Sequence, residues 1–367
     1  MAVYKLFPEK DATLYSEYPA MNTGIDEIIE SSTQLAVDGS PAVSRFLVQF
    51  NQSQIQDVLN TKASGSLAVY FKTYMAKVSG LGEEVTLYNY AASGSWQNGT
   101  GKYLDSPETQ NGVSWKYRTS SGSGAWLTSG FGSTGATASF TTGYEGGGNW
   151  YTSSTYIQSA SFQYRSEFDL SFNVTNTVLA WYSGSIVNNG FIVKQADSDE
   201  FDITKTAEFK YFSVDTNTIY PPQLEFRWSD FTFNTGSSTQ TFVTSSDIVV
   251  TLPNNAGAYQ PQAIQRFRIN ARPQFPPRIF LTSSFYTTNY YLPTASYWSI
   301  KDLDTDETVV EFDTQYTKIS ADSNSNYFDV YMDGLEPERY YKILIKTLIG
   351  GTTQILDNNY YFKVING

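Results

Sequence analysis

The sequence contains neither cysteine nor histidine among its 367 residues. Without cysteine the chain can form no disulfide, no thiolate metal site and no cysteine nucleophile. Without histidine it lacks imidazole ligands, the usual general base near neutral pH and the Ser-His-Asp triad. These absences exclude most common catalytic designs, so we expect no enzyme activity, no catalytic residues, no cofactor and no metal.

Charged residues are also scarce, at 16% of the chain, and 24 basic against 36 acidic residues give a formal net charge of −12. This excess of negative charge disfavours binding to phosphate backbones and anionic lipids. The N-terminus lacks the basic and apolar regions of a secretory signal, and no apolar run reaches about 18 residues. We therefore expect no nucleic-acid partner, no membrane, and synthesis in a cytoplasm.

Aromatic residues, in contrast, make up 16% of the chain and include 28 Tyr and 24 Phe, which favours strands over helices. Residues 168–174 alternate apolar and polar side chains, as a half-buried strand does. The turn at 188–190 leads into a second strand at 191–193. A short helix is expected at 51–62, where Asn51 or Ser53 can cap it. The predicted class is all-β.

Composition along the chain predicts three regions. Residues 1–235 are expected to form a jelly-roll-like β-sandwich. Residues 236–277 are read as a linker with short strands, or as part of a small middle β domain, and a proline cluster marks their end: Pro273, Pro276 and Pro277. Residues 278–367 are expected to form an immunoglobulin-like or fibronectin-like sandwich, because Leu335 and Pro337 precede two tyrosines as in a tyrosine corner.

Tryptophans recur in the glycine-rich and serine-rich segment 92–151, which is too aromatic to be disordered. Three interpretations are open: the indoles plug an end of the sandwich, they stack on carbohydrate, or they contact another subunit. The candidate interface or glycan-stacking residues are Trp96, Trp115, Trp126, Trp150 and Tyr151.

Two acidic clusters are candidates for calcium sites. Residues 302–307 carry carboxylates at alternate positions, but they lack the glycine and the terminal glutamate of a helical calcium loop. We expect a solvated turn there and the same at 197–202. A glycosidase would need two carboxylates with one in an apolar setting, and no Asp or Glu is singled out by its neighbours.

Several motifs resemble the β-sandwich module called DNRLRE. The opening carries Asp11-Ala12, the turn Asn22-Thr23-Gly24 and the strand that starts at Arg45. The closing part carries Asn173-Val174-Thr175, Val178, Trp181 and Asn188-Asn189-Gly190-Phe191. The resemblance covers roughly residues 1–230. DNRLRE modules occur in secreted wall-associated proteins and in virion proteins of tailed phages.

The resemblance implies a fold rather than an activity. Because no secretory signal is found, the phage setting is favoured over the cell wall. The segments 296–313 and 334–347 also resemble the end of structural proteins from contractile-tailed phages of cyanobacteria. We therefore expect a non-enzymatic virion component of the neck, tail, baseplate or capsid exterior, in contact with other virion proteins and copies of itself. The alternative is an adhesin or tail-fibre component that binds a host surface glycan.

Overall fold

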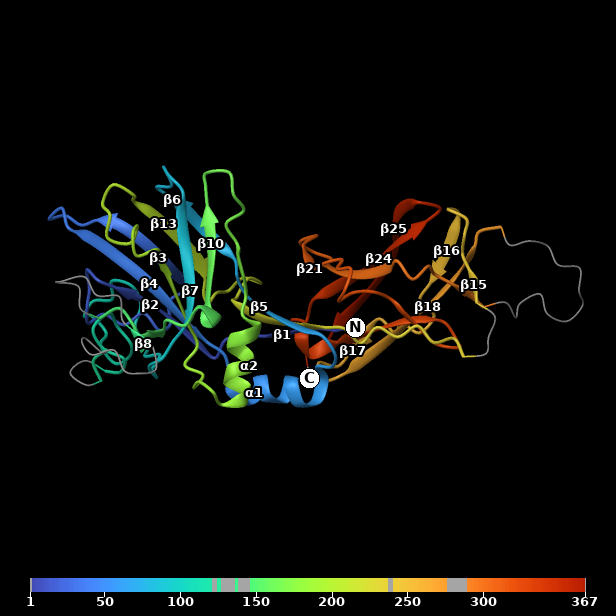
Figure 1. Cartoon of the computed structure of the whole chain (residues 1–367), viewed down its shortest axis with the longest axis horizontal. Coiled ribbons are helices and arrows are strands. Elements are labelled where there is room, and N and C mark those ends of the chain that lie inside the picture. Colours follow the sequence, from blue (N-terminus) through green and yellow to red (C-terminus); the bar gives the residue numbers. More distant parts are fainter. Residues whose placement is uncertain are drawn as a thin grey trace, which may run out of the picture. The chain divides into compact units, whose positions relative to one another are not determined.

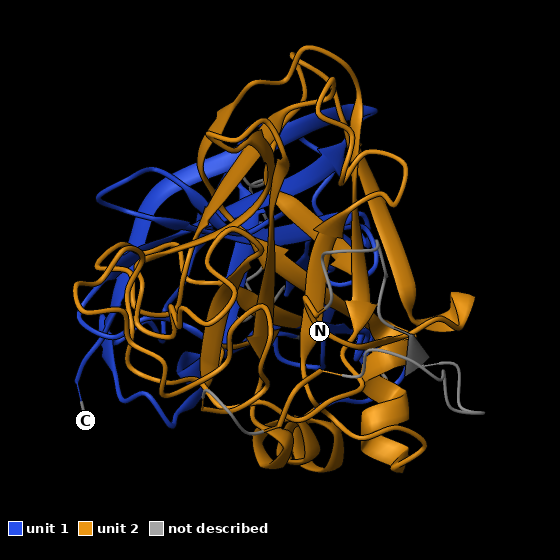
Figure 2. Cartoon of the chain, turned by 90° about the vertical axis from the view of Figure 1, so that its left-hand side faces the viewer, with its two compact units in different colours: residues 1–5, 63–67, 226–367 blue, residues 6–62, 68–225 orange. Residues whose placement is uncertain are grey.

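The computed structural model describes residues 2–120, 124–126, 136–137, 146–236, 240–275 and 289–366. Strands hold about 43% of the chain and helices about 8%, so the predicted all-β class is confirmed. The chain forms two compact units, unit 1 (residues 1–5, 63–67 and 226–367) and unit 2 (residues 6–62 and 68–225), which Figures 1 and 2 show. None of the described helices has the length and apolar character that crossing a membrane requires.

The largest sheet has eight strands and belongs to unit 2. Its order is β10-β7-β12-β4-β3-β13-β6, and β2 pairs with β4 beside this path. The strands are β2 (Lys10–Tyr15), β3 (Ile28–Leu35), β4 (Pro41–Gln49), β6 (Met75–Ser79), β7 (Val85–Ala91), β10 (Ile157–Phe162), β12 (Phe191–Gln195) and β13 (Ala207–Phe212).

A second sheet has the order β1-β14-β5-β11. Its strands are β1 (Ala2–Leu6), β14 (Gln223–Trp228), β5 (Leu67–Thr73) and β11 (Leu170–Asn173), and the chain passes between the two units within β1, β5 and β14. Aromatic rings join this sheet to the larger one in unit 2: Phe71 of β5 stacks on Phe191 of β12 at 4.8 Å. The predicted alternation at 168–174 is confirmed in β11, where Leu170 and Phe172 are buried and Ser171 is exposed.

Helix α1 (Gln52–Asp57) continues into the π-helical turn Val58–Lys62, where a helix was predicted. Asn51 caps it as expected, since its side chain accepts hydrogen bonds from the backbone N–H groups of Ser53 and Gln54. Helix α2 (Thr175–Ser183) was not predicted. It buries Val178 and Trp181, three residues apart on one face. Two short 3₁₀ turns lie at Ser154–Tyr156 and Met332–Gly334.

Unit 1 packs two further sheets against each other. One has the order β16-β18-β23-β22 and the other the order β17-β25-β24-β20-β21. The strands are β16 (Ile248–Thr251), β17 (Ala258–Tyr259), β18 (Ile264–Pro273), β20 (Ser296–Asp302), β21 (Thr308–Val310), β22 (Ser320–Ala321), β23 (Asn326–Tyr331), β24 (Tyr340–Ile349) and β25 (Thr352–Val364). Two small pairs complete the described strands: β15 (Thr241–Phe242) with β19 (Tyr290–Tyr291), and β8 (Ala136–Thr137) with β9 (Trp150–Tyr151).

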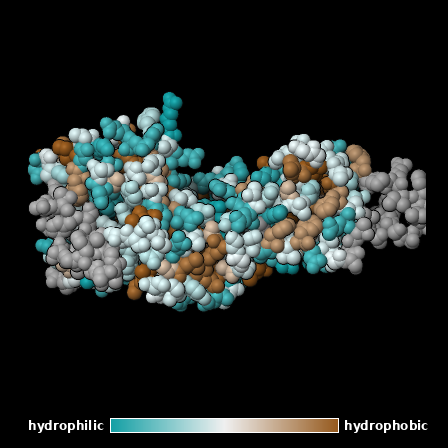
Figure 3. All heavy atoms as spheres, viewed as in Figure 1, coloured by the Kyte–Doolittle hydropathy of each residue, from teal (hydrophilic) through white to brown (hydrophobic). Residues whose placement is uncertain are grey.

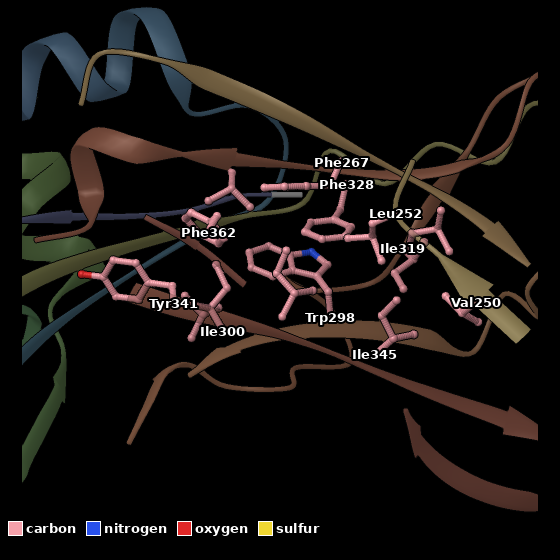
Figure 4. Packing of buried hydrophobic residues seen from close by; sticks show 14 of the residues in the cluster. Val250, Leu252, Phe267, Trp298, Ile300, Ile319, Phe328, Tyr341, Ile345 and Phe362 are labelled. Carbon is pink, nitrogen blue, oxygen red and sulfur yellow. The ribbon is translucent and has the colours of Figure 1, made fainter. Parts of the chain in front are cut away.

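The core of unit 1 joins its two sheets, as Figure 4 shows. Trp298 of β20 stacks on Phe328 of β23 with ring centroids 4.9 Å apart. Val250 and Phe267, from the segment expected to be a linker, are buried in the same cluster. The described part of 236–277 therefore belongs to the sandwich of unit 1, while Pro276 and Pro277 lie outside the described residues.

The tyrosine corner is present in unit 1. Tyr341, at the start of β24, is 2% exposed and its hydroxyl donates to the backbone carbonyl of Glu336 at 2.9 Å. This bond ties the strand to the loop before it, as in immunoglobulin-like sandwiches. Burial raises the pKa of Tyr341, so the phenol stays protonated and continues to donate at physiological pH.

Candidate functional site

The predicted binding tryptophans lie inside unit 2 and not on its surface. Trp96, Trp115, Trp126 and Trp150 are between 1% and 4% exposed. They share a core cluster with apolar residues of the eight-stranded sheet: Ala12, Leu14, Val43, Leu47 and Ile192. A sugar can stack only on an exposed ring face, and the structure leaves these indoles none. The glycan-stacking and interface interpretations are thus corrected to packing for these four side chains.

The indole N–H groups of two of these tryptophans also form hydrogen bonds with the backbone. Trp96 Nε1 donates to the carbonyl of Asn189 at 2.9 Å, and Trp126 Nε1 donates to the carbonyl of Ser114 at 2.9 Å. These bonds satisfy the polar groups that burial would otherwise leave unpaired. Tyr151 is half-buried, and its ring lies edge-on to Tyr156. Its role in an interface or in glycan stacking stays a prediction.

A buried ion pair lies beneath the tryptophans. Arg45 of β4 binds Glu200 through Nε to Oε1 at 2.5 Å and Nη2 to Oε2 at 2.8 Å, and both side chains are fully buried. Lys194 of β12 adds a second cation 2.7 Å from Oε2 of Glu200. The guanidinium carbon of Arg45 lies 4.7 Å from the Trp115 ring centroid and 5.4 Å from that of Trp150. The cations are therefore enclosed by a carboxylate and by π faces.

The glycine run before Trp150 makes room for this arrangement. Arg45 Nη1 donates to the carbonyl of Gly147 at 2.7 Å. Gly147 has φ +72°, and a Cβ there would lie 2.6 Å from that same nitrogen and 2.9 Å from the Trp115 ring. Any side chain at this position would clash and would strain the backbone. The glycine therefore permits close packing on the ion pair.

The acidic cluster at 197–202 is paired with cations of its own chain. Glu200 binds Arg45 and Lys194, while Asp199 binds Lys205 at 2.9 Å. The expectation of a solvated turn is wrong for these two carboxylates, because Asp199 is 5% exposed and Glu200 is fully buried. Lys194 is a near neighbour of Glu200 in the sequence, but Arg45 lies 155 positions before it, so local composition gave no sign of the pairing with Arg45.

The acidic turn at 302–307 is likewise organised around one buried carboxylate. Asp302 is 2% exposed; its Oδ1 accepts from the N–H groups of Asp304 and Thr305, and its Oδ2 accepts from Arg339 Nε at 2.6 Å. Burial raises the pKa of Asp302, but the hydrogen bond from Arg339 and those of the turn outweigh it and lower the pKa. Among the described residues, no three Asp or Glu side chains are grouped so that they could hold a metal ion.

A different group of polar side chains surrounds a depression in unit 2. The register places Tyr15 of β2 opposite Ser44 of β4, Ser44 opposite Ser32 of β3, and Ser32 opposite Glu208 of β13. Residues directly opposite each other on antiparallel strands point to the same side of the sheet. Four strands thus bring together residues that are almost 200 positions apart.

Glu30 of β3 lies opposite Lys210 of β13, two residues along from the pair Ser32 and Glu208. Lys210 Nζ lies 3.4 Å from Glu30 Oε2 and 2.7 Å from Glu208 Oε1. Ser32 donates to Glu30 Oε1 at 3.0 Å, and the hydroxyl oxygens of Ser32 and Ser44 are 2.8 Å apart. The two carboxylates, one ammonium and two hydroxyls therefore form one connected polar network.

The two glutamates of this network have opposite pKa shifts. Burial raises the pKa of Glu30, and the Lys210 ammonium offsets part of the rise. Burial also acts to raise the pKa of Glu208, but hydrogen bonds from Lys210, Ser79 and Lys77 outweigh it and bring the pKa to about 2. Glu208 is therefore a fixed negative charge, whereas Glu30 is the carboxyl that takes up a proton more readily.

Tyr103 borders this network from a loop. Its ring packs on Tyr15 with centroids 4.7 Å apart and edge-on to Tyr18 at 6.1 Å, yet Tyr103 is 45% exposed. Asp26 accepts a hydrogen bond from the Tyr103 N–H at 3.2 Å. The ring is thus held in place by two neighbours and still presents surface to solvent.

The motif Asn22-Thr23-Gly24 fixes the loop that carries Tyr103. The Asn22 side-chain amide donates to the carbonyls of Asn98 and Val113, and its oxygen accepts from the Gly101 N–H at 2.8 Å. A Cβ on Gly24 would lie 2.1 Å from the carbonyl oxygen of Asn98. The motif read from the sequence as a turn therefore also anchors the segment from Asn98 to Val113 against β2.

We call the resulting concave site the Tyr103 depression. It has a volume of about 110 Å³, and its lining includes Tyr15, Tyr103, Glu30, Gln34, Glu208 and Lys210. An adjoining depression of about 370 Å³ shares the lining residues Glu17 and Ala42 with it. Sequence reasoning missed this site, because its residues come from four strands and two loops. The one local signal is the uninterrupted polar run from Glu30 to Gln34 in β3.

Comparison with known proteins adds little. No family model matches the sequence, and no curated protein matches it. The solved adhesin domain of Epf from Streptococcus pyogenes is similar over 98% of this chain and 98% of that chain, with 9% sequence identity and a TM-score of 0.18. A similarity at that TM-score supports no inference about this chain.

Proposed function

We propose that the chain is a non-enzymatic structural component of a tailed-phage virion, in the neck, tail, baseplate or capsid exterior. It acts through contacts with other virion proteins and with copies of itself. The DNRLRE-like motifs in residues 1–230 and the resemblance of 296–313 and 334–347 to phage structural proteins support this setting. The observation that carries the contact role is the open edge of strand β25.

Strand β25 is 13 residues long and pairs with β24 along one edge. On the other edge, β17 pairs with Lys363 and Val364. No other strand of the described residues pairs with that edge, so Thr352–Leu356 presents its backbone groups without a ladder partner there. An edge of this kind is a template for another chain.

The composition of this edge favours a protein partner. In proteins that stay monomeric, lysine, proline or a bulge in an edge strand prevents that strand from pairing with another chain. Thr352–Leu356 contains no charge and no proline, and the irregular register with β24 begins after Leu356. Ile355 is 59% exposed and Leu348 of β24 is 44% exposed, and Figure 3 shows apolar side chains on the surface over these strands. An added strand would cover them.

The charged groups of the chain support a non-catalytic role. The pKa values of Glu30 and Glu208 are shifted in opposite directions, which is the pattern of a glycosidase. Lys210 Nζ, however, binds both carboxylates, whereas a glycosidase needs a water molecule or the glycosidic oxygen beside them. Arg45, Glu200 and Asp302 are used in buried ion pairs.

Quantitative mass spectrometry of purified particles tests this proposal. We expect the chain at a fixed copy number per particle, and we expect Ile355→Lys to lower its incorporation by about tenfold or more, because a lysine at an edge opposes strand addition. Ile203→Lys is the matched control, since Ile203 is 47% exposed and lies in unit 2. Absence of the chain from purified particles would refute the virion assignment. Equal incorporation of the two variants would refute the role of the edge.

A further inference from the structure

We propose that the Tyr103 depression binds a neutral sugar residue of a glycan. This inference goes beyond the structural role, and it does not depend on the chain's place in a particle. The tryptophans are buried, so they are not the proposed binding residues. The proposed site consists of tyrosines and polar residues of the strands.

The aromatic part of the site suits a sugar ring. One face of a pyranose carries C–H groups, which pack on an exposed aromatic ring. Tyr103 is 45% exposed, and its contacts with Tyr15 and Tyr18 fix the ring's orientation before any ligand arrives. Binding on a ring that is already ordered costs little side-chain entropy.

The polar part of the site matches hydroxyl groups, each of which donates one hydrogen bond and accepts others. Glu30 offers carboxylate acceptors, Lys210 offers an ammonium donor, and Gln34 offers both kinds of group in one amide. All three line the depression. Gln34 is exposed and donates to Glu208 Oε1 at 3.2 Å, so its amide is free to turn toward a ligand at small cost.

Charge limits the ligand class. Three carboxyl groups, those of Glu17, Glu30 and Glu208, line the depression against the single ammonium of Lys210 among its lining residues. This excess of negative charge opposes phosphate, sulfate and acidic sugars such as sialic acid. The charge of Lys210 is also balanced by Glu30 and Glu208, so its ammonium can donate a hydrogen bond to a hydroxyl group but adds no net positive charge for an anion. A neutral hexose or N-acetylhexosamine remains.

The size of the depression sets the scale of the complex. About 110 Å³ is room for several water molecules, and one sugar ring would displace them. The adjoining space of about 370 Å³, which shares Glu17, is where a second residue of an oligosaccharide would continue. A single ring with a few hydrogen bonds and one stacking contact gives a millimolar dissociation constant, on the order of 4 kcal/mol.

Saturation-transfer NMR on the full chain is the first test. The probes are the methyl glycosides of glucose, galactose, mannose and N-acetylglucosamine, with sialic acid as the charged comparison. A glycan array then extends the search to oligosaccharides. We expect transfer to at least one neutral probe and none to sialic acid. If no neutral probe and no neutral array glycan binds, or if sialic acid binds best, the proposal is overturned.

Variants at Tyr103 then locate the site. We expect Tyr103→Ala to weaken binding of the neutral probe by about tenfold, the value of one aromatic contact, and Tyr103→Phe to keep it within about threefold. Tyr164→Ala is the matched control, because Tyr164 is 83% exposed and does not line the depression. Gln34→Ala, at another exposed lining residue, should also weaken binding. Unchanged binding by both Tyr103→Ala and Gln34→Ala, with circular dichroism showing folded proteins, would place the sugar elsewhere.

Discussion

Arg45 and Glu200 lie 155 positions apart in the sequence and form a two-point ion pair in which neither side chain is exposed. Glu200 also binds Lys194, whose second partner is the exposed carboxylate of Asp197, so Glu200 is the one buried carboxylate that both cations share. The ion pair joins β4 to the segment that follows β12, and the Trp115 and Trp150 rings cover it. Interior charges of this kind are costly to leave unpaired.

Removing the shared carboxylate should destabilise unit 2 strongly. We expect Glu200→Gln to lower the free energy of unfolding by about 3–5 kcal/mol, because the buried Arg45 would lose its carboxylate and Lys194 would keep only the exposed Asp197. Asp329→Asn is the control: its partner Arg266 is 47% exposed, and a surface pair contributes at most about 1 kcal/mol. Urea unfolding followed by tryptophan fluorescence suits the comparison, since five of the seven tryptophans report on unit 2, while Trp228 and Trp298 report on unit 1, which holds Asp329. Equal losses in the two variants would contradict the prediction.

Trp181 of α2 is predicted to be a core residue. It is 2% exposed, and its ring lies 4.8 Å from that of Phe191 on β12. Trp181→Ala should cost about 3–5 kcal/mol through lost burial and a new cavity. The next residue supplies the control: Tyr182 is 40% exposed, and Tyr182→Ala should cost about 1 kcal/mol or less. Equal melting temperatures for Trp181→Ala and Tyr182→Ala would show that the burial of Trp181 against the sheet does not stabilise unit 2.

Asp11 should make the stability of unit 2 fall as pH rises, although the chain has no histidine. Burial raises the pKa of Asp11 well above its usual range, and the nearby Asp215 and Asp26 add to the rise, against a hydrogen bond from the Val214 N–H that lowers it. The folded state therefore holds a proton that the unfolded chain releases. Its stabilising effect is complete below about pH 4 and is lost as pH rises through the folded-state pKa.

The variant Asp11→Asn isolates this effect. Its free energy of unfolding should match the wild type near pH 3.5 and exceed it increasingly toward pH 7. Asp202→Asn should behave oppositely, because hydrogen bonds from Thr204 lower the pKa of exposed Asp202 and the wild type gains stability as pH rises. Urea unfolding of the three proteins from pH 3.5 to 7 measures both slopes. A constant difference between Asp11→Asn and wild type would contradict the titration.

Chelators should leave the melting temperature unchanged. Both oxygens of Asp302 already accept hydrogen bonds, and Glu200 is bound to two cations of the chain. We expect calorimetric melting in EDTA and in calcium to agree. A shift above about 5 °C, on the order of 1 kcal/mol for a unit of this size, would instead assign a metal to one of these clusters.

Local sequence patterns predicted those features that depend on neighbouring residues. Alternation identified the strand at Leu170 and Phe172, the cap at Asn51 marked a helix start, and Leu335 with Pro337 marked the tyrosine corner that Tyr341 forms. Helix α2 was missed because the run Val178–Trp181 is short and wholly apolar, so its period is hidden.

Features that depend on distant partners could not be predicted in this way. The packing of Trp115 and Trp150 on Arg45 joins segments that lie far apart in the sequence, although packing at an end of the sandwich was one of the three interpretations of these tryptophans. The Tyr103 depression needs the register that places Ser32 between Ser44 and Glu208. A single sequence records the polar run of β3, but it does not record which strands pair with it.

Hydrogen exchange at the edge of β25 tests most directly the central claim that this chain works by protein contacts in a virion. The amides of Thr352–Leu356 should be compared between the free chain and purified particles, with the self-buried segment around Trp96 and Trp115 as the internal reference. We predict that the edge amides exchange at least about tenfold more slowly in particles, because a ladder partner protects them, while the reference segment is unchanged. Equal exchange of Thr352–Leu356 in the two states would contradict the claim.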